Sequence, residues 1–166
     1  MTDAVQINRR LKPGQYRLAE VFAGIRAYAV LEAIFADADE IDWVMTHIKV
    51  LVVDRPKEMF VDNDDGSITI GLAHLRLASD EILYLDIIHE LCHVKQHLEG
   101  RNLYDREKAY VDRETEIEAY QVTVREARRI GLNDSAIANY LRVSWITPEE
   151  HRRLAVRLEV TCIGPS

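Results

Sequence analysis

The residues best suited to chemistry form the run His89-Glu90-Leu91-Cys92-His93, which has the pattern H-E-x-x-H. Residues four apart on an α-helix project from the same face, so both imidazoles can reach a single metal ion. Glu90 lies beside them and is placed to act as a general base toward a water molecule. We therefore expect His89 and His93 to bind a zinc ion (Zn²⁺) and Glu90 to be catalytic. A zinc site of this kind needs a third protein ligand from elsewhere in the chain.

The motif lies in a segment that reads as one long helix from Ser79 or Asp80 to about Glu99, with Gly100 as its stop. At 100° per residue, one face is apolar and should pack on a core. This face holds Leu83, Ile87, Leu91, Val94 and Leu98. The face with Asp86, the motif residues and His97 is polar and should line a cleft. His97 is about 12 Å along the axis from His89, so we expect it to be solvent-exposed and not a ligand of the same ion.

The third ligand is expected from the next helical segment, residues 108–130, which contains Glu114, Glu116 and Glu118. Helical angles place Glu116 within the less polar stripe and turn the other two toward arginine-rich sides. A buried carboxylate is costly unless a cation pairs with it, and a metal ion held by two neutral histidines is such a cation. Glu116 is therefore the predicted third ligand. The alternative is a buried ion pair, for instance with Arg26.

These two motifs resemble those of the gluzincin group of zinc metallopeptidases, and most of all its smallest members, the minigluzincins. The motifs are also similar to those of membrane-embedded CAAX-type proteases and of ImmA/IrrE-type regulatory proteases. In that group the first Glu of a Glu-x-x-Ala run is the metal ligand, which maps onto Glu116. The group often has an Asp four residues later, where this chain has Tyr120, so the partner of a zinc-bound histidine is not identified. The resemblance spans about residues 47–130 and implies a zincin-like core.

Composition favours one domain over residues 1–166, because 48% of the residues are hydrophobic and only seven Gly and four Pro are present. The net charge of −7 argues against a nucleic-acid partner and fits a peptide or protein substrate better. Residues 1–10 are polar, and no run of eighteen apolar residues occurs, so no membrane segment is expected. Two cysteines form no disulfide framework, which favours the cytoplasm. The oligomeric state is not indicated.

The remaining pattern predicts an α+β fold. We expect an N-terminal helix over residues 16–36, strands over 48–53, 59–61 and 68–75 in a three-stranded sheet, and short helices over 133–141 and 147–160. By resemblance to zincins, the strand that begins at Ile68 should border the cleft and pair with an extended substrate. The Asp-rich turn before it is expected to be a hairpin turn, not a calcium loop. With Gly66 in the sixth position of such a loop, Val61 and Leu72 would occupy two ligand positions.

Several residues near these elements have roles that the sequence leaves open. The group that stabilises the oxyanion could be Tyr104, Tyr110, His74 or His151. A lone surface position is the favoured interpretation of His74, and His151 and Trp145 are expected to be structural. Cys92 lies off the histidine face and is expected to serve helix packing.

Two other classes of protein remain as alternatives. One is a catalytically latent zincin-like regulatory or binding protein, which would keep the same residues. The other is a di-metal helical bundle, because Glu90 to His93 also fits Glu-x-x-His, with Glu20 or Glu32 and Glu114 or Glu118 as further ligands. The chain lacks the second Glu-x-x-His that such a bundle needs. A deformylase-type hydrolase fits less well, because its upstream cysteine ligand motif is missing.

Overall fold

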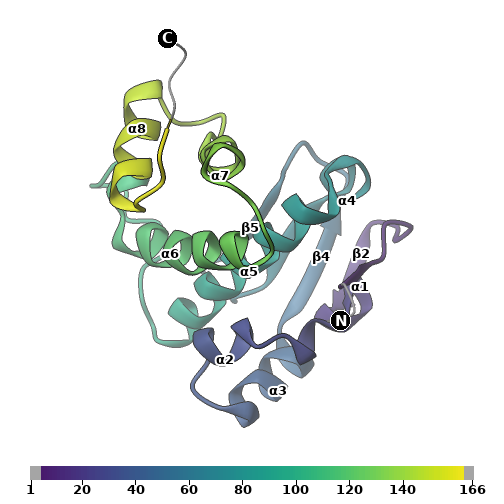
Figure 1. Cartoon of the computed structure of the whole chain (residues 1–166). Coiled ribbons are helices and arrows are strands. Elements are labelled where there is room, and N and C mark those ends of the chain that lie inside the picture. The colour runs from purple at the N-terminus through teal and green to yellow at the C-terminus, as the bar shows by residue number, and fades with distance from the viewer. Residues whose placement is uncertain (1–4, 163–166) are drawn as a thin grey trace.

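Helices and two small sheets make up the described chain, residues 5–162, of this computed structural model. Residues 1–4 and 163–166 belong to the expected domain 1–166 but lie outside the described residues. The mixture of helix and sheet agrees with the expected α+β class. In Figure 1 the sheet lies on one side of α5 and α6, and the C-terminal helices α7 and α8 lie on another.

The main sheet has four strands in the order β2-β4-β6-β5, one more than predicted. Its strands are β2 (Gly14–Arg17), β4 (Lys49–Val53), β5 (Met59–Val61) and β6 (Ile68–Gly71). The pair β4 and β6 is parallel, and the other two pairs are antiparallel. Val50, Val52, Ile68 and Ile70 are buried, as expected for a β-branched run in the middle of a sheet.

The predicted helix over residues 16–36 is wrong, because the structure divides this segment into short pieces. They are α1 (Leu18–Val21), β3 (Phe22–Ala23), the 3-10 turn η1 (Ile25–Ala27) and α2 (Val30–Ile34). Gly24 has φ +85°, a left-handed conformation that ends the helical path. β3 pairs with β1 (Gln6–Ile7), and α3 (Ala38–His47) follows where no helix was expected. The apolar residues of the segment are nevertheless largely buried.

The helix that carries the motif is α5 (Asp80–Leu98), and the Ser79 side chain caps it by accepting a hydrogen bond from the Ile82 N–H. α6 (Glu114–Arg129) packs along α5, and Figure 1 shows the two side by side. α6 begins later than the predicted residue 108, because the 3-10 turn η2 (Tyr110–Asp112) precedes it. The contact between α5 and α6 brings the two predicted motifs together.

The expectation that the strand from Ile68 pairs with substrate is wrong. β6 ends at Gly71 and continues as α4 (Leu72–Leu77), and it lies between β4 and β5 within the sheet. β5 is instead the edge strand on the side of α5. The turn between β5 and β6 is a hairpin turn, as predicted, in which the Asp62 N–H donates to the Ser67 carbonyl over 2.8 Å.

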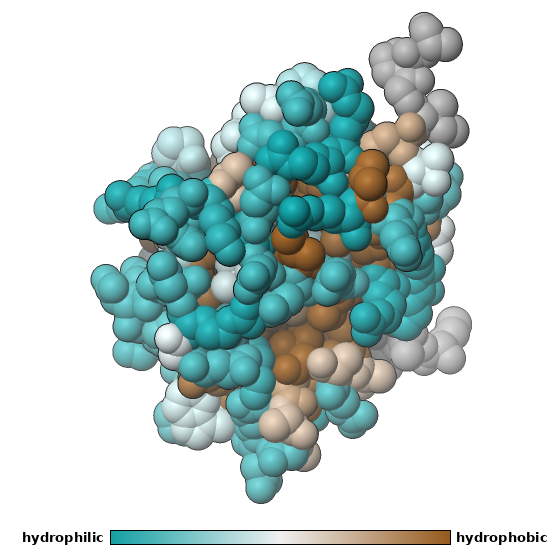
Figure 2. All heavy atoms as spheres, turned by 90° about the vertical axis from the view of Figure 1, so that its left-hand side faces the viewer, coloured by the Kyte–Doolittle hydropathy of each residue, from teal (hydrophilic) through white to brown (hydrophobic). Residues whose placement is uncertain are grey.

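The C-terminal helices are α7 (Asp134–Leu141) and α8 (Pro148–Arg157). Thr147 and Glu150 form the predicted capping box of α8, which ends three residues before the predicted residue 160. Within residues 5–162, no helix combines the length and the apolar character needed to cross a bilayer. The face in Figure 2 has a central region of apolar surface, in brown, bordered by hydrophilic residues.

Candidate metal centre

The side chains of His89, His93 and Glu116 converge at the contact between α5 and α6. The Nε2 atoms of the two histidines lie 3.1 Å apart, and each also lies close to the Glu116 carboxylate, at 3.1 Å for His89 and 3.3 Å for His93. All three residues are buried. The structure thus brings together the three residues that helical spacing and angle selected.

The donor atoms have the spacing that a zinc ion requires. Ligands about 2.0–2.1 Å from a tetrahedral zinc lie roughly 3.4 Å from one another, close to the observed separations. Burial alone would raise the pKa of Glu116, but the two histidines lower it far below its usual range. Burial would likewise lower the pKa of His93, yet the Glu116 charge raises it to about 9. The carboxylate is therefore held in the charged form that binds a cation.

Glu90 is buried beside this triad and lines the adjoining cleft. Its Oε2 atom has no hydrogen-bond partner among the described residues. Burial raises the pKa of this carboxyl group to about 8. A buried carboxyl oxygen without a partner is rare, and it points to a group that acts on something the protein itself does not supply.

Gln96 holds the ring of His93 in place, a partner that the sequence analysis did not find. The Gln96 Oε1 accepts a hydrogen bond from His93 Nδ1 over 2.7 Å, and its Nε2 donates to the Thr115 carbonyl over 2.9 Å. In the neutral form of His93 that binds a metal ion, this contact keeps the ring proton on Nδ1 and leaves Nε2, which is directed at the triad, free as a ligand. The signal in the sequence was the spacing of three residues between His93 and Gln96, which places the two side chains as neighbours on a helix.

Glu118 is not part of the triad. It forms a two-armed ion pair with Arg101 and accepts a hydrogen bond of 3.3 Å from Gln96 Nε2. The alternative partner for Glu116, Arg26, pairs instead with Asp42 at 2.6 Å. The predicted choice of Glu116 over Glu118 therefore agrees with the geometry, while its role as a metal ligand stays a prediction.

Tyr120, which stands where related motifs often have Asp, packs its ring on His89 with centroids 4.3 Å apart. Its hydroxyl shares a hydrogen bond of 2.8 Å with that of Tyr110, and both rings line the cleft. No described residue partners His89 Nδ1. Packing against the Tyr120 ring, at an interplanar angle of 51°, therefore orients the His89 ring.

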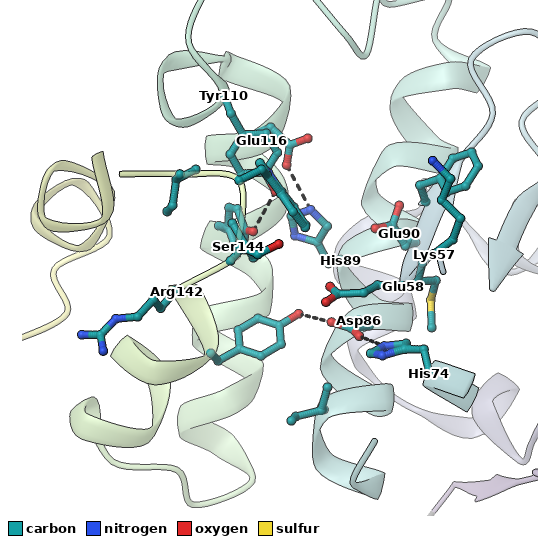
Figure 3. Close-up of a pocket in the computed structure, with 18 of the residues that line it drawn as sticks. Lys57, Glu58, His74, Asp86, His89, Glu90, Tyr110, Glu116, Arg142 and Ser144 are labelled. Atoms are coloured by element: carbon teal, nitrogen blue, oxygen red, sulfur yellow. Dashed lines mark hydrogen bonds and ion pairs between the residues drawn. The ribbon is translucent and has the colours of Figure 1, made fainter. Parts of the chain in front are cut away.

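A second polar group lies one helical turn before His89. Asp86 accepts hydrogen bonds from the Tyr140 hydroxyl and from His74 Nε2, each over 2.7 Å (Figure 3). Burial would lower the pKa of His74, but Asp86 raises it above its usual value. His74 is therefore not the lone surface residue that was expected: only 14% of its side chain is exposed, and it lines the cleft.

The candidate metal centre and this polar group share one cleft of about 1180 Å³. Its walls come from β5 and the residues before it, from α4 and α5, from residues 104–120, and from the end of α7 with the following loop. Its apolar lining includes Met59, Phe60, Ala78, Ile82, Val143, Trp145 and Ile146. Trp145 is thus a half-exposed cleft residue and not the structural residue that was expected.

Three other predicted residues lie outside this cleft. His151 is buried and hydrogen-bonded to the Ala138 carbonyl at 2.7 Å, so it is structural and no oxyanion donor. His97 is partly buried, with its ring against Gly66, instead of fully exposed. Cys92 is buried, and burial raises the pKa of its thiol to about 12, which agrees with the predicted packing role.

The di-metal alternative receives no support from the geometry. Glu20 accepts a hydrogen bond from the Arg17 N–H at the start of α1, and Glu118 is paired with Arg101. Among the described residues, only His89, His93 and Glu116 form a group able to hold a metal ion. The four-stranded sheet is also foreign to a pure helical bundle.

Comparison with known proteins supplied no relative for this chain. No family model matches, and neither a curated protein nor a solved structure matches it.

Proposed function

We propose that this protein is a zinc-dependent metallopeptidase of the gluzincin type, with a zincin-like core. The observation that carries the proposal is the buried Glu90 carboxyl group, unpartnered at Oε2, beside the convergent His89, His93 and Glu116 on the wall of a cleft. Structural zinc sites use four protein ligands, whereas three ligands with an acid beside them are typical of hydrolytic sites. The cleft gives a substrate access to these groups.

Zinc bound by the three ligands would polarise the scissile carbonyl and favour ionisation of water. Glu90 accepts the proton of the attacking water at its free Oε2 and passes it to the leaving amine. The pKa of about 8 is that of Glu90 in the protein without a metal ion. A dication bound beside Glu90 would lower this pKa and stabilise the charged carboxylate, which is the form that acts as a base. His93 keeps its orientation through Gln96, and His89 through Tyr120.

The tyrosine pair supplies a donor for the oxyanion. Only one of the two hydroxyl protons of Tyr110 and Tyr120 can lie between their oxygens, so the other proton is free to point elsewhere. Because the Tyr120 ring packs on His89, this proton is available close to the reacting carbonyl. The Tyr140 hydroxyl, by contrast, already donates to Asp86.

A peptide or protein is the substrate class that fits the cleft, which combines the edge of β5 at Met59 with apolar and acidic side chains. The net charge of −7 makes nucleic acid an unsuitable partner. Both cysteines are free thiols, and we therefore place the enzyme in the cytoplasm.

The test is the metal content of the purified protein by elemental mass spectrometry, for wild type and for Glu116→Ala and Glu118→Ala. We expect one zinc per chain, lost in Glu116→Ala and retained in Glu118→Ala, because only Glu116 faces the two histidines. Glu90→Gln should keep its zinc and lose peptide hydrolysis by a factor of about 10² or more. Protein without zinc under zinc-replete conditions would refute the proposal. Full activity in Glu90→Gln would refute the role of Glu90, and zinc-loaded wild type inactive on peptide libraries would favour the latent alternative.

A further inference from the structure

The outer edge of β5 is the place where an extended peptide could pair with the sheet beside the metal centre. In the antiparallel pair with β6, the Asp62 N–H donates to Ser67, and the Gly71 N–H donates to the Glu58 carbonyl. Bonded and non-bonded pairs alternate in such a ladder, so residues 58, 60 and 62 face β6. The backbone groups of Met59 and Val61 therefore face outward, toward the cleft.

The outward groups of Val61 are already engaged by the protein. The Tyr104 hydroxyl donates to the Val61 carbonyl, and the Val61 N–H forms a hydrogen bond to Glu90. Before β5 the chain turns, with the Lys57 N–H bonded to the Arg55 carbonyl and the Lys57 carbonyl directed at Gly71. Within the described residues, Met59 alone keeps both backbone groups for a ligand on this edge.

The two ends of this short edge differ. At the Val61 end, Glu90 accepts a hydrogen bond from the Val61 N–H, and the Tyr104 hydroxyl donates to the Val61 carbonyl. Both side chains line the cleft. At the other end the cleft continues along Glu58, His74 and Asp86 toward Ile82. Figure 3 shows the Glu58 carboxylate pointing into this part of the cleft. A chain that pairs with this edge can therefore extend past Met59, whereas at the Val61 end Tyr104 already occupies the backbone acceptor.

The direction of the bound chain decides which terminus lies at Tyr104. Antiparallel pairing is the commoner arrangement and is slightly more stable per residue. A peptide antiparallel to β5 has its amino-terminal side at Val61 and its carboxyl-terminal side along Met59 and Glu58. Burial is the largest cause that raises the pKa of the Tyr104 hydroxyl, and the nearby carboxylates of Glu90, Glu116 and Asp62 add to it. Asp62 is not a predicted metal ligand, so its charge remains at this end and suits an ammonium group.

We propose that Tyr104 closes one end of the cleft, so that the enzyme removes residues from the free amino terminus of a peptide and does not cut within long chains. This inference rests on the proposed peptidase function and names its substrate class. The water adds across the peptide bond near the amino terminus, which releases the terminal residue or residues with a new carboxylate and leaves a new amine on the remaining chain.

The experiment uses zinc-loaded protein and a set of peptides that share one core sequence. One has a free amino terminus, one is N-acetylated, one is C-amidated, and one is extended by ten residues before the core. Product masses should show release from the free amino terminus only, with at least tenfold slower cleavage of the acetylated peptide. The extended peptide should be cut at its new amino end. Cleavage within its core at a comparable rate, or sensitivity to amidation instead of acetylation, overturns the proposal.

Two variants test the role of Tyr104 itself. Tyr104→Ala removes the ring and frees the Val61 carbonyl, so internal cuts should rise relative to terminal cuts by about tenfold, the value of one regained hydrogen bond. Tyr104→Phe frees the carbonyl but keeps the ring, and should change the ratio less. Circular dichroism confirms folding of both. An unchanged ratio in folded Tyr104→Ala overturns the proposal, because the end of the cleft would then be closed by something else.

A readout without turnover separates this inference from the peptidase function. Zinc-loaded Glu90→Gln should bind the free-amine peptide at least tenfold more tightly than its acetylated form in calorimetry. If wild type hydrolyses no peptide but this preference is seen, the peptidase function fails and recognition of the amino terminus stands. Equal affinities overturn the inference even where hydrolysis is observed.

Discussion

Replacing Gln96 with leucine should weaken zinc binding by about 10- to 100-fold, the usual cost of losing the partner of a metal-binding histidine. Leucine has a similar size but cannot accept the His93 Nδ1 proton, which is now bonded over 2.7 Å. The loss corresponds to about 1.4–2.8 kcal/mol, within the range for a buried donor left without an acceptor. His93 is buried, so water cannot replace Gln96.

The measurement is the zinc dissociation constant by competition with a chromogenic chelator, together with urea unfolding of the metal-free and zinc-loaded proteins. Gln121→Leu is the matched control, since Gln121 is an exposed glutamine on α6. Gln96→Glu keeps the acceptor for His93 but loses the donor to the Thr115 carbonyl and to Glu118, so it should hold zinc more tightly than Gln96→Leu. If Gln96 served structure alone, its loss would lower the stability of both forms equally and leave the dissociation constant unchanged. If Gln96→Leu and Gln121→Leu have the same zinc affinity, the proposed role of Gln96 in orienting His93 is refuted.

Two further predictions concern the framework of the site. Asp86 raises the pKa of His74, so the folded state binds a proton at this imidazole more tightly than the unfolded state does. The stability gained from this proton is fully present below about pH 6.5 and is lost as the pH rises through the raised pKa. Urea unfolding across this range should show the loss in wild type but not in His74→Gln, and a parallel profile in the two proteins would contradict the assignment. Gly71→Ala should cost about 3 kcal/mol or more, because its Cβ would lie 1.7 Å from the Lys57 carbonyl oxygen. Gly100→Ala, whose Cβ meets nothing within 4 Å, should cost only about 1 kcal/mol for its left-handed backbone, and equal costs for both would show that the contact at Gly71 relaxes.

The convergence of His89, His93 and Glu116 was accessible from the sequence because it depends on helix geometry. A spacing of four fixes His89 and His93 on one face, and the angle of Glu116 within an apolar stripe implies burial. Both relations hold within single helices and do not depend on how the chain folds elsewhere. The contact between α5 and α6 then needed only the two faces to meet.

The partners of these residues depend on distant contacts and could not be read in the same way. Tyr140 reaches Asp86 across 54 positions of sequence, and Tyr104 reaches Val61 across 43. The strand order is a similar case, because parallel pairing of β4 with β6 leaves β5 at the edge and no local pattern specifies it. The sequence therefore indicated the three converging side chains but not the residues that contact them or line the cleft.

The N-terminal segment shows a different limit. Its apolar residues recur with helical spacing and are largely buried. Such a pattern indicates which residues face the core, but it does not require that they lie on one continuous helix. The same residues are buried here by short helical turns, a two-residue strand and a glycine with positive φ, and one continuous helix is not needed. Pairing of β2 with β4 removes Gly14–Arg17 from any helix. Tertiary pairing overrides local preference here.

The burial of Cys92 within the motif makes the stability of α5 accessible to chemical labelling. Its thiol is buried and fully protonated at neutral pH, so a disulfide reagent can react only when this part of the helix opens. With Cys162 replaced by serine, the labelling rate of the remaining thiol counts those openings directly. A bound metal ion that holds α5 against α6 must slow them, so one absorbance trace reports the occupancy of the centre without any substrate.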